Sequence, residues 1–72
     1  MPVTIRATGL LKRFVAPDTV LENTHTVGEA VTQLALPEDI GLVMLVNGHT
    51  AHWHTVLRDG DTLQLIPVIS GG

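Results

Sequence analysis

The feature that most constrains the fold is a five-residue run, Leu42 to Val46, in which every residue is apolar. A strand with one face in water has polar residues at every second position, so this run predicts a central strand covered on both faces. Asn47-Gly48 follows directly, and both residues tolerate the positive φ of a two-residue hairpin turn. The strand is therefore predicted to fold back onto a short edge strand within residues His49 to Leu57.

One helix is predicted to lie on this sheet. Thr26 and Glu29 have the spacing of a capping box, in which the Thr26 hydroxyl meets the amide of Glu29 and the Glu29 carboxylate reaches back to the amide of Thr26. Pro37 is expected to end the helix. Apolar residues spaced as one helical stripe follow the cap and need a sheet to bury them: Val27, Ala30, Val31 and Leu34.

The remaining segments predict further strands. Val3 to Ala7 alternates between apolar and polar residues, as a first strand does, and after a long loop over Gly9 to Asp18 a second strand is predicted within Thr19 to Asn23. Asp59-Gly60-Asp61 predicts a turn, and the alternation from Thr62 to Ile66 predicts the last strand.

The order of these elements, two strands, one helix and three strands, defines a single α+β domain over residues 1–72. Two hairpins that cradle one helix form the ubiquitin-like β-grasp arrangement, here with a mixed sheet of four to five strands. Pro67 cannot donate a hydrogen bond inside a strand ladder, and Ser70-Gly71-Gly72 has no side chain able to anchor it. We therefore expect the last strand to stop at Ile66 and a flexible arm to occupy residues 67–72.

Composition argues against several classes of function. The net charge is −3, and the four Lys and Arg residues form no stripe, so a nucleic-acid partner is not expected. The absence of cysteine excludes disulfides, iron–sulfur clusters and thiol catalysis. No signal peptide is visible, and the longest apolar run is far too short to cross a membrane. We expect a cytoplasmic protein without a membrane partner.

The histidines do not predict a metal site. His52 and His54 would share one face of a strand, close to His49, but no carboxylate or thiol completes a ligand set. Trp53 points the other way, and we expect it to pack half-buried against the edge of the sheet. Asp59 and Asp61 are turn-forming residues and predict no acid–base pair.

Three segments together resemble the MoaD/ThiS family of sulfur carriers: Val46-Asn47-Gly48, Leu57-Arg58-Asp59-Gly60-Asp61 and Ile66-Pro67-Val68-Ile69-Ser70-Gly71-Gly72. Either turn alone is common, whereas Gly-Gly closing a β-grasp pattern is much rarer. The resemblance covers nearly the whole chain. It implies a carrier rather than an enzyme, whose working group is the carboxylate of Gly72, reached past Gly71.

In that family an E1-like adenylating enzyme uses ATP to activate the terminal carboxylate, and a sulfur donor converts it into a thiocarboxylate. The resemblance therefore implies no bound cofactor, with ATP held by the partner. The Ile66-Pro67 step resembles the small subunit of molybdopterin synthase, whose large subunit would be the acceptor. Thiazole synthesis, tRNA thiolation, a ubiquitin-like modifier conjugated through Gly72 and a plain interaction module stay open as alternatives.

A carrier must be held while its tail reacts, and the second face of the sheet is the predicted docking surface. If Val43 and Leu45 face the helix, Met44 and Val46 point outward. With the opposite strand phase, Val43 and Leu45 take their place. The residues expected to bind partners are those of the outward positions and the arm, namely Met44, Val46, Ile66, Pro67, Val68, Ile69 and Ser70.

Overall fold

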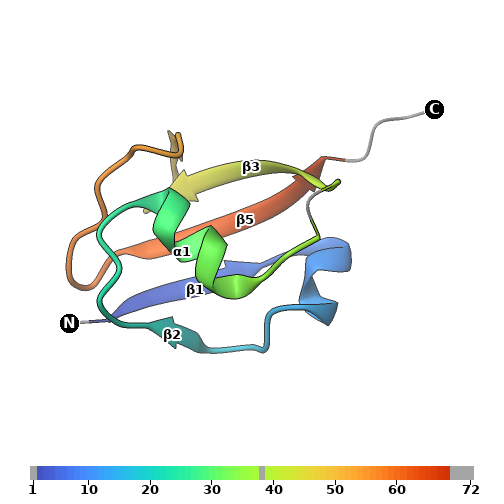
Figure 1. Ribbon diagram of the computed structural model, residues 1–72, viewed down its shortest axis with the longest axis horizontal. Helices are drawn as coiled ribbons and strands as arrows, with labels where there is room; N and C mark the ends of the chain where they lie inside the picture. The colour runs from blue at the N-terminus through green and yellow to red at the C-terminus, as the bar shows by residue number, and fades with distance from the viewer. Residues whose placement is uncertain (1, 38, 69–72) are drawn as a thin grey trace.

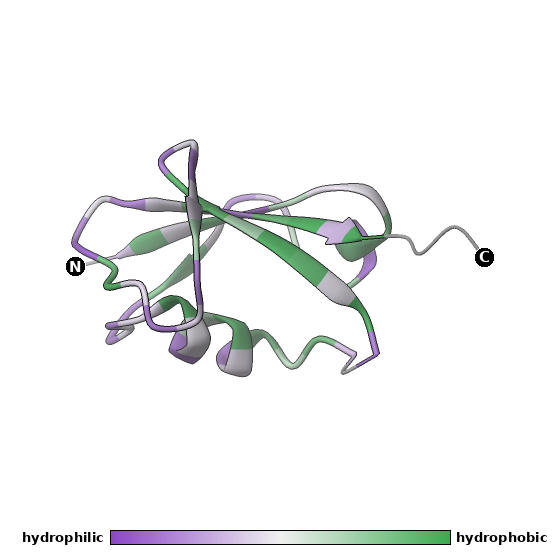
Figure 2. Ribbon diagram, turned by 90° about the horizontal axis from the view of Figure 1, so that it is seen from above, coloured by the Kyte–Doolittle hydropathy of each residue, from purple (hydrophilic) through white to green (hydrophobic). Residues whose placement is uncertain are grey.

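The computed structural model describes residues 2–37 and 39–68 (Figure 1). Its elements are β1 (Val3–Ala7), the 3₁₀ helix η1 (Gly9–Arg13), β2 (Thr19–Leu21), α1 (Val27–Leu34), β3 (Gly41–Val46), β4 (His49–Ala51) and β5 (Thr62–Val68). The five strands form one sheet in the order β2-β1-β5-β3-β4, with β1 and β5 parallel and the other neighbours antiparallel. Figure 2 shows α1 against one face of this sheet. The predicted ubiquitin-like β-grasp fold is confirmed.

Helix α1 begins at the predicted cap. Thr26 has an extended backbone, and its hydroxyl oxygen accepts a hydrogen bond from the Glu29 amide at 3.2 Å. The predicted donor of the second hydrogen bond in the capping box is wrong by one residue. The Glu29 carboxylate accepts from the amide of His25, at 3.2 Å, and not from that of Thr26. An antiparallel bridge between Thr26 and Val56 holds this stretch extended, which brings the His25 amide to the carboxylate.

Other predicted boundaries shift by a few residues. Strand β2 ends at Leu21, before the predicted limit at Asn23, and the loop after β1 contains η1. Helix α1 ends at Leu34, because Ala35 adopts a left-handed conformation with φ 54° before the chain reaches Pro37. The predicted short edge strand is confirmed as β4.

The predicted phase of β3 is wrong. Met44 is only 7% exposed, whereas Val43 is 39% exposed, so Met44 faces the helix and Val43 faces outward. Val46 also packs against the core. The physical reason lies in the register with β5, which places Met44 opposite Leu65 and Val46 opposite Leu63, and residues directly opposite share one face of a sheet. The alternative phase, with Val43 and Leu45 outward, is the one that the fold adopts.

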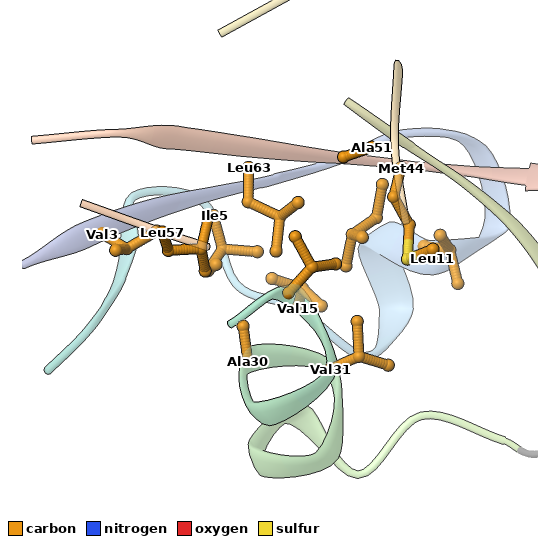
Figure 3. Close-up of a cluster of buried hydrophobic side chains, with 12 residues drawn as sticks. Val3, Ile5, Leu11, Val15, Ala30, Val31, Met44, Ala51, Leu57 and Leu63 are labelled. Carbon is orange, nitrogen blue, oxygen red and sulfur yellow. The ribbon is translucent and has the colours of Figure 1, made fainter. Parts of the chain in front are cut away.

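The core lies between α1 and the sheet, with η1 closing one end (Figure 3). Its centre is β5, whose Leu63 and Leu65 are both 0% exposed. Strands β1, β3 and β4, the helix and the loops each add apolar side chains. The buried cluster consists of Val3, Ile5, Leu11, Val15, Val27, Ala30, Val31, Met44, Ala51, Leu57, Leu63 and Leu65.

Strand β5 does not stop at Ile66, as predicted, but continues through Pro67 to Val68. The Asn47 amide donates to the Thr62 carbonyl at 2.9 Å, which shows that the backbone groups of Thr62 face β3. Because backbone groups alternate along a strand, those of Ile66 and Val68 also face β3, and Pro67 faces the β1 side. Pairing of β1 with β5 has ended by then, at Ala7 opposite Leu65. The missing N–H of Pro67 therefore removes no bond to β3.

The Asn47-Gly48 turn is confirmed, with φ values of 51° and 85°, and it also ties the β3–β4 hairpin to the start of β5. The Asn47 side-chain amide donates to the Asp61 carboxylate at 2.9 Å, and its oxygen accepts from the Thr62 amide at 3.0 Å. The other Asp61 oxygen accepts from the Arg58 amide at 2.8 Å. The start of β5 is thereby fixed to the end of β3.

The phase of β3 is tested by placing a charge on each of its faces. Met44→Asp puts an unpaired carboxylate into the core, and we expect a loss of about 3 kcal/mol or more in the free energy of unfolding. The carboxylate of Val43→Asp is exposed to solvent, so we expect a loss of about 1 kcal/mol or less in the free energy of unfolding. Urea unfolding followed by circular dichroism measures both values. The reverse ranking would show that the helix packs on the other face of β3.

The hydrogen bonds of the Asp61 carboxylate predict that the protein loses stability in acid. The hydrogen bond from the Arg58 amide, followed by that from the Asn47 side chain, lowers the pKa of Asp61 below its ordinary value of 3.8. A lowered pKa in the folded state gives a stabilisation that is present above pH 3.8 and is lost as the pH falls through the folded value. Asp61→Asn should therefore flatten the dependence of the melting temperature on pH in this acid range. A slope in Asp61→Asn equal to that of the parent protein would contradict this stabilisation.

Candidate functional site

The last residues of β5 are held from both sides. On one edge Val68 lies opposite Gly41 of β3. On the other edge the Thr8 amide donates to the Leu65 carbonyl at 3.1 Å, and η1 packs against Pro67. The direction in which the chain leaves the sheet at Val68 is therefore set by the fold.

Gly9 allows this close contact of η1 with β5. Its φ of +56° lies in the left-handed region, and a Cβ at this position would lie 3.2 Å from Cγ of Pro67. Glycine meets both requirements, because it has no Cβ and no penalty for positive φ. The pairing of Gly9 with Pro67 was not foreseen, since the two residues lie far apart in the sequence.

An apolar surface surrounds the end of β5 on the sheet face that points away from α1. Val43 lies opposite Ile66, and Leu45 lies opposite Gln64 in the next row of the sheet. Val43 and Val68 are 39% and 51% exposed. Such an exposed apolar group at a fixed position is typical of a surface that binds another protein. We call these four residues the outer patch: Val43, Leu45, Ile66 and Val68.

Basic residues lie beside the outer patch. Arg6 of β1 lies opposite Gln64 of β5, and Gln64 in turn lies opposite Leu45 of β3. Lys12 and Arg13 occupy the last turn of η1, and all three side chains are exposed. The chain has four Lys and Arg residues and a net charge of −3. Three of these four residues lie on β1 and η1, the two elements next to the end of β5.

The structure brings together only some of the predicted partner-binding residues. Ile66, Pro67 and Val68 lie together at the end of β5. Met44 and Val46 face the core and therefore cannot contribute to an exposed surface. The remaining predicted residues, Ile69, Ser70, Gly71 and Gly72, lie outside the described part of the chain.

Other candidate chemistries gain no support. Among residues 2–37 and 39–68 no group of three or more His, Cys, Asp or Glu side chains is arranged to hold a metal ion. Trp53 is 50% exposed, as expected of a half-buried residue, but it packs on Gly28 of α1. No helix in the described part is long and apolar enough to span a membrane.

A model of the ThiS family matches residues 9–72. The chain belongs to the ThiS family. The resemblance to MoaD/ThiS proteins is thereby confirmed, and the fold is that of ubiquitin-like sulfur carriers and modifiers. No curated protein matches the chain.

Solved structures of ubiquitin-like proteins share the fold of this ThiS-family chain. SAMP1 from Haloferax volcanii is 21% identical over the whole of both chains, with a TM-score of 0.74. Urm1 from Trypanosoma brucei is 22% identical over 99% of this chain and 95% of its own, with a TM-score of 0.75. A chain in the complex of subunits 1 and 2 of the molybdopterin-converting factor from Helicobacter pylori is 24% identical over the whole of both chains, with a TM-score of 0.69.

The contact between Gly9 and Pro67 is tested by adding one methyl group. Gly9→Ala forces a Cβ into the left-handed region and against Pro67, so we expect a loss of about 1 to 2 kcal/mol in stability and shifted NMR signals at Val68. Gly60→Ala is the matched control, because Gly60 also has a positive φ, 86°, but nothing lies within 4 Å of its Cβ position. The control should cost stability without moving the signals of Val68. Equal signals at Val68 in Gly9→Ala and the parent protein would contradict the contact.

Proposed function

We propose that this chain is a sulfur carrier whose Gly72 carboxylate is adenylated by an E1-like enzyme and then converted into a thiocarboxylate. The observation that carries the proposal is the position of β5, which leads the ThiS-family chain directly from a rigid sheet toward Gly71-Gly72. The fold supplies a fixed support and an adjacent docking surface, while the partner enzyme holds ATP.

The chemistry consists of two substitutions. In the first, a carboxylate oxygen of Gly72 attacks the α-phosphorus of ATP, a P–O bond forms and pyrophosphate leaves. In the second, the sulfur of a donor attacks the acyl carbon and AMP leaves, because a mixed anhydride has a far better leaving group than a free carboxylate. The donor delivers this sulfur as hydrosulfide, so the new C–S bond replaces the C–O bond to AMP and the product is the thiocarboxylate. Glycines at positions 71 and 72 suit the first step, since a chain without Cβ atoms fits a narrow channel.

The outer patch is the proposed docking surface for the activating enzyme. Its apolar side chains supply the buried area of an interface, and the exposed basic residues Arg6, Lys12 and Arg13 favour an acidic rim on the partner. The patch includes Val68, the last described residue before the reacting tail. A partner seated on the patch is therefore also positioned at the tail.

The proposed acceptor is the large subunit of a molybdopterin synthase. The Ile66-Pro67 step supports this choice, as does the similar fold of a chain in the complex of the two subunits of the molybdopterin-converting factor. The same activated tail is compatible with conjugation to lysine side chains of other proteins. A sulfur acceptor and a protein target are distinguished by the product that forms.

The proposal is tested by the intact mass of the protein after incubation with ATP, an E1-like enzyme and a sulfur donor from the same organism. We expect a gain of about 16 Da, the difference between sulfur and oxygen, located at Gly72 by fragmentation. Removal of Gly71-Gly72 should abolish the gain. An unchanged mass, with an enzyme that modifies another carrier, would refute the proposal, and high-mass conjugates would favour a modifier.

Two variants separate docking from chemistry in the same assay. Val43→Asp should slow formation of the product about tenfold, because a charge in the outer patch costs on the order of 1.4 kcal/mol of binding. Val56→Asp is the matched control, since Val56 is 63% exposed and lies outside the patch. Equal rates for both variants would remove the outer patch from the proposal while leaving the chemistry at Gly72 intact.

A further inference from the structure

Strand β4 covers only part of the free edge of β3. Its three residues pair with Met44, Leu45 and Val46, whereas β3 begins at Gly41. After β4 the chain turns away toward the start of α1, where the Gly28 amide donates to the Trp53 carbonyl at 2.9 Å. In Figure 1 the chain after β4 accordingly stays at the arrowhead end of β3. The first half of β3 is therefore an open edge.

Leu42 presents its backbone to this open edge. Because the Asn47 amide bonds to β5, alternation along β3 directs the backbone groups of Val43 and Leu45 to β5, and those of Leu42 and Met44 to the opposite edge. Met44 finds its partner there in Ala51. No strand of the described chain pairs with Leu42 on that side. An N–H and a C=O in this arrangement are a template for a further strand.

A groove runs beside the open edge, between β3 and the end of α1. Its volume is about 560 Å³, within the range of sites that bury the side chains of a ligand. Most of the residues that line it are apolar, and Thr32 contributes a hydroxyl group. The apolar residues that line it include Leu36, Pro37, Ile40, Leu42, Met44 and Trp53.

Trp53 forms one wall of the groove and is held rigidly. Its carbonyl accepts the Gly28 amide, and its ring packs so tightly on α1 that a Cβ at Gly28 would lie 3.1 Å from ring atom Cε3. Half of the residue is still exposed. A fixed, half-exposed tryptophan beside an apolar groove is the kind of side chain that contributes most of the binding energy in protein interfaces.

We propose that this groove, with the open edge of β3, is a second docking site, which takes an extended segment of a partner protein with apolar side chains at alternate positions. The N–H and C=O of Leu42, with which no strand of the described chain pairs, select a strand over a helix, because a helix has no backbone groups free to pair. Alternate side chains of that strand then enter the groove. The site does not depend on the chemistry proposed for Gly72.

The two surfaces lie on opposite faces of the same strand. Val43 belongs to the outer patch, whereas Leu42 belongs to the groove, and Gly41 of the groove lies opposite Val68 at the start of the tail. Partners can therefore occupy both surfaces at once, each beside the same end of β5. This geometry permits a complex in which one protein holds the outer patch while a second is recruited through the groove.

The site is tested by NMR with a defined probe, an acetylated and amidated hexapeptide of alternating valine and serine. We expect its addition to the full chain to shift the Leu42 amide and the Trp53 indole signals, and to slow the exchange of the Leu42 amide with solvent. The same peptide N-methylated at every residue has lost the backbone N–H of each residue, which a strand needs for pairing, and should not bind. Absence of shifts at high peptide concentration, or equal binding of the methylated peptide, would overturn the proposal.

Protein variants locate the binding. Trp53→Ala should lower the affinity for the probe about tenfold, as expected for a hot-spot side chain. Thr32→Lys places a good helix former on an exposed position of the groove wall. It should weaken binding of the probe because apolar side chains in the groove would desolvate the ammonium group. The result then does not depend on the stability of one variant. Val20→Thr, an exposed position on β2 at the other edge of the sheet, should bind the probe as the parent does. Signals at Leu42 that change with protein concentration alone would instead assign the edge to a second copy of the chain.

Discussion

The structure depends on β5 lying between β1 and β3. Leu63 and Leu65 are completely buried at this position, and their strand pairs in parallel with β1 and antiparallel with β3. The two hairpins meet only through this strand, so the helix has a continuous surface to cover only after β5 is in place. These contacts join segments that lie far apart in the sequence, so the entropy cost of closing long loops must be met before the sheet is complete.

Local signals in the sequence predicted the elements well. The spacing of Thr26 and Glu29 identified the start of the helix, and Asn47-Gly48 identified the turn between β3 and β4, because each depends on interactions between near neighbours. The resemblance in Ile66 to Gly72 identified the family. None of these signals requires knowledge of which strands pair.

Features that depend on pairing were not predictable in the same way. The run from Leu42 to Val46 has no polar residue to mark its outward face, so only the register with β5 decides that Met44 is buried and Val43 exposed. Pro67 was read as the end of the strand, yet its missing N–H falls on the side where β1 has already ended. Two of the five predicted docking residues that the structure describes, Met44 and Val46, therefore face the core, whereas Ile66, Pro67 and Val68 lie at the end of β5.

The extension of β5 to Val68 shortens the tether on which the proposed reaction takes place. Gly72 is the fourth residue after Val68, and this length of chain spans at most roughly 14 Å. The catalytic centre of a partner must then lie within that radius of the sheet edge, and a short tether keeps the local concentration of the carboxylate there high, on the order of millimolar. Selectivity in such a system resides in where a partner docks, since an enzyme bound elsewhere on the domain is out of range of the same tail.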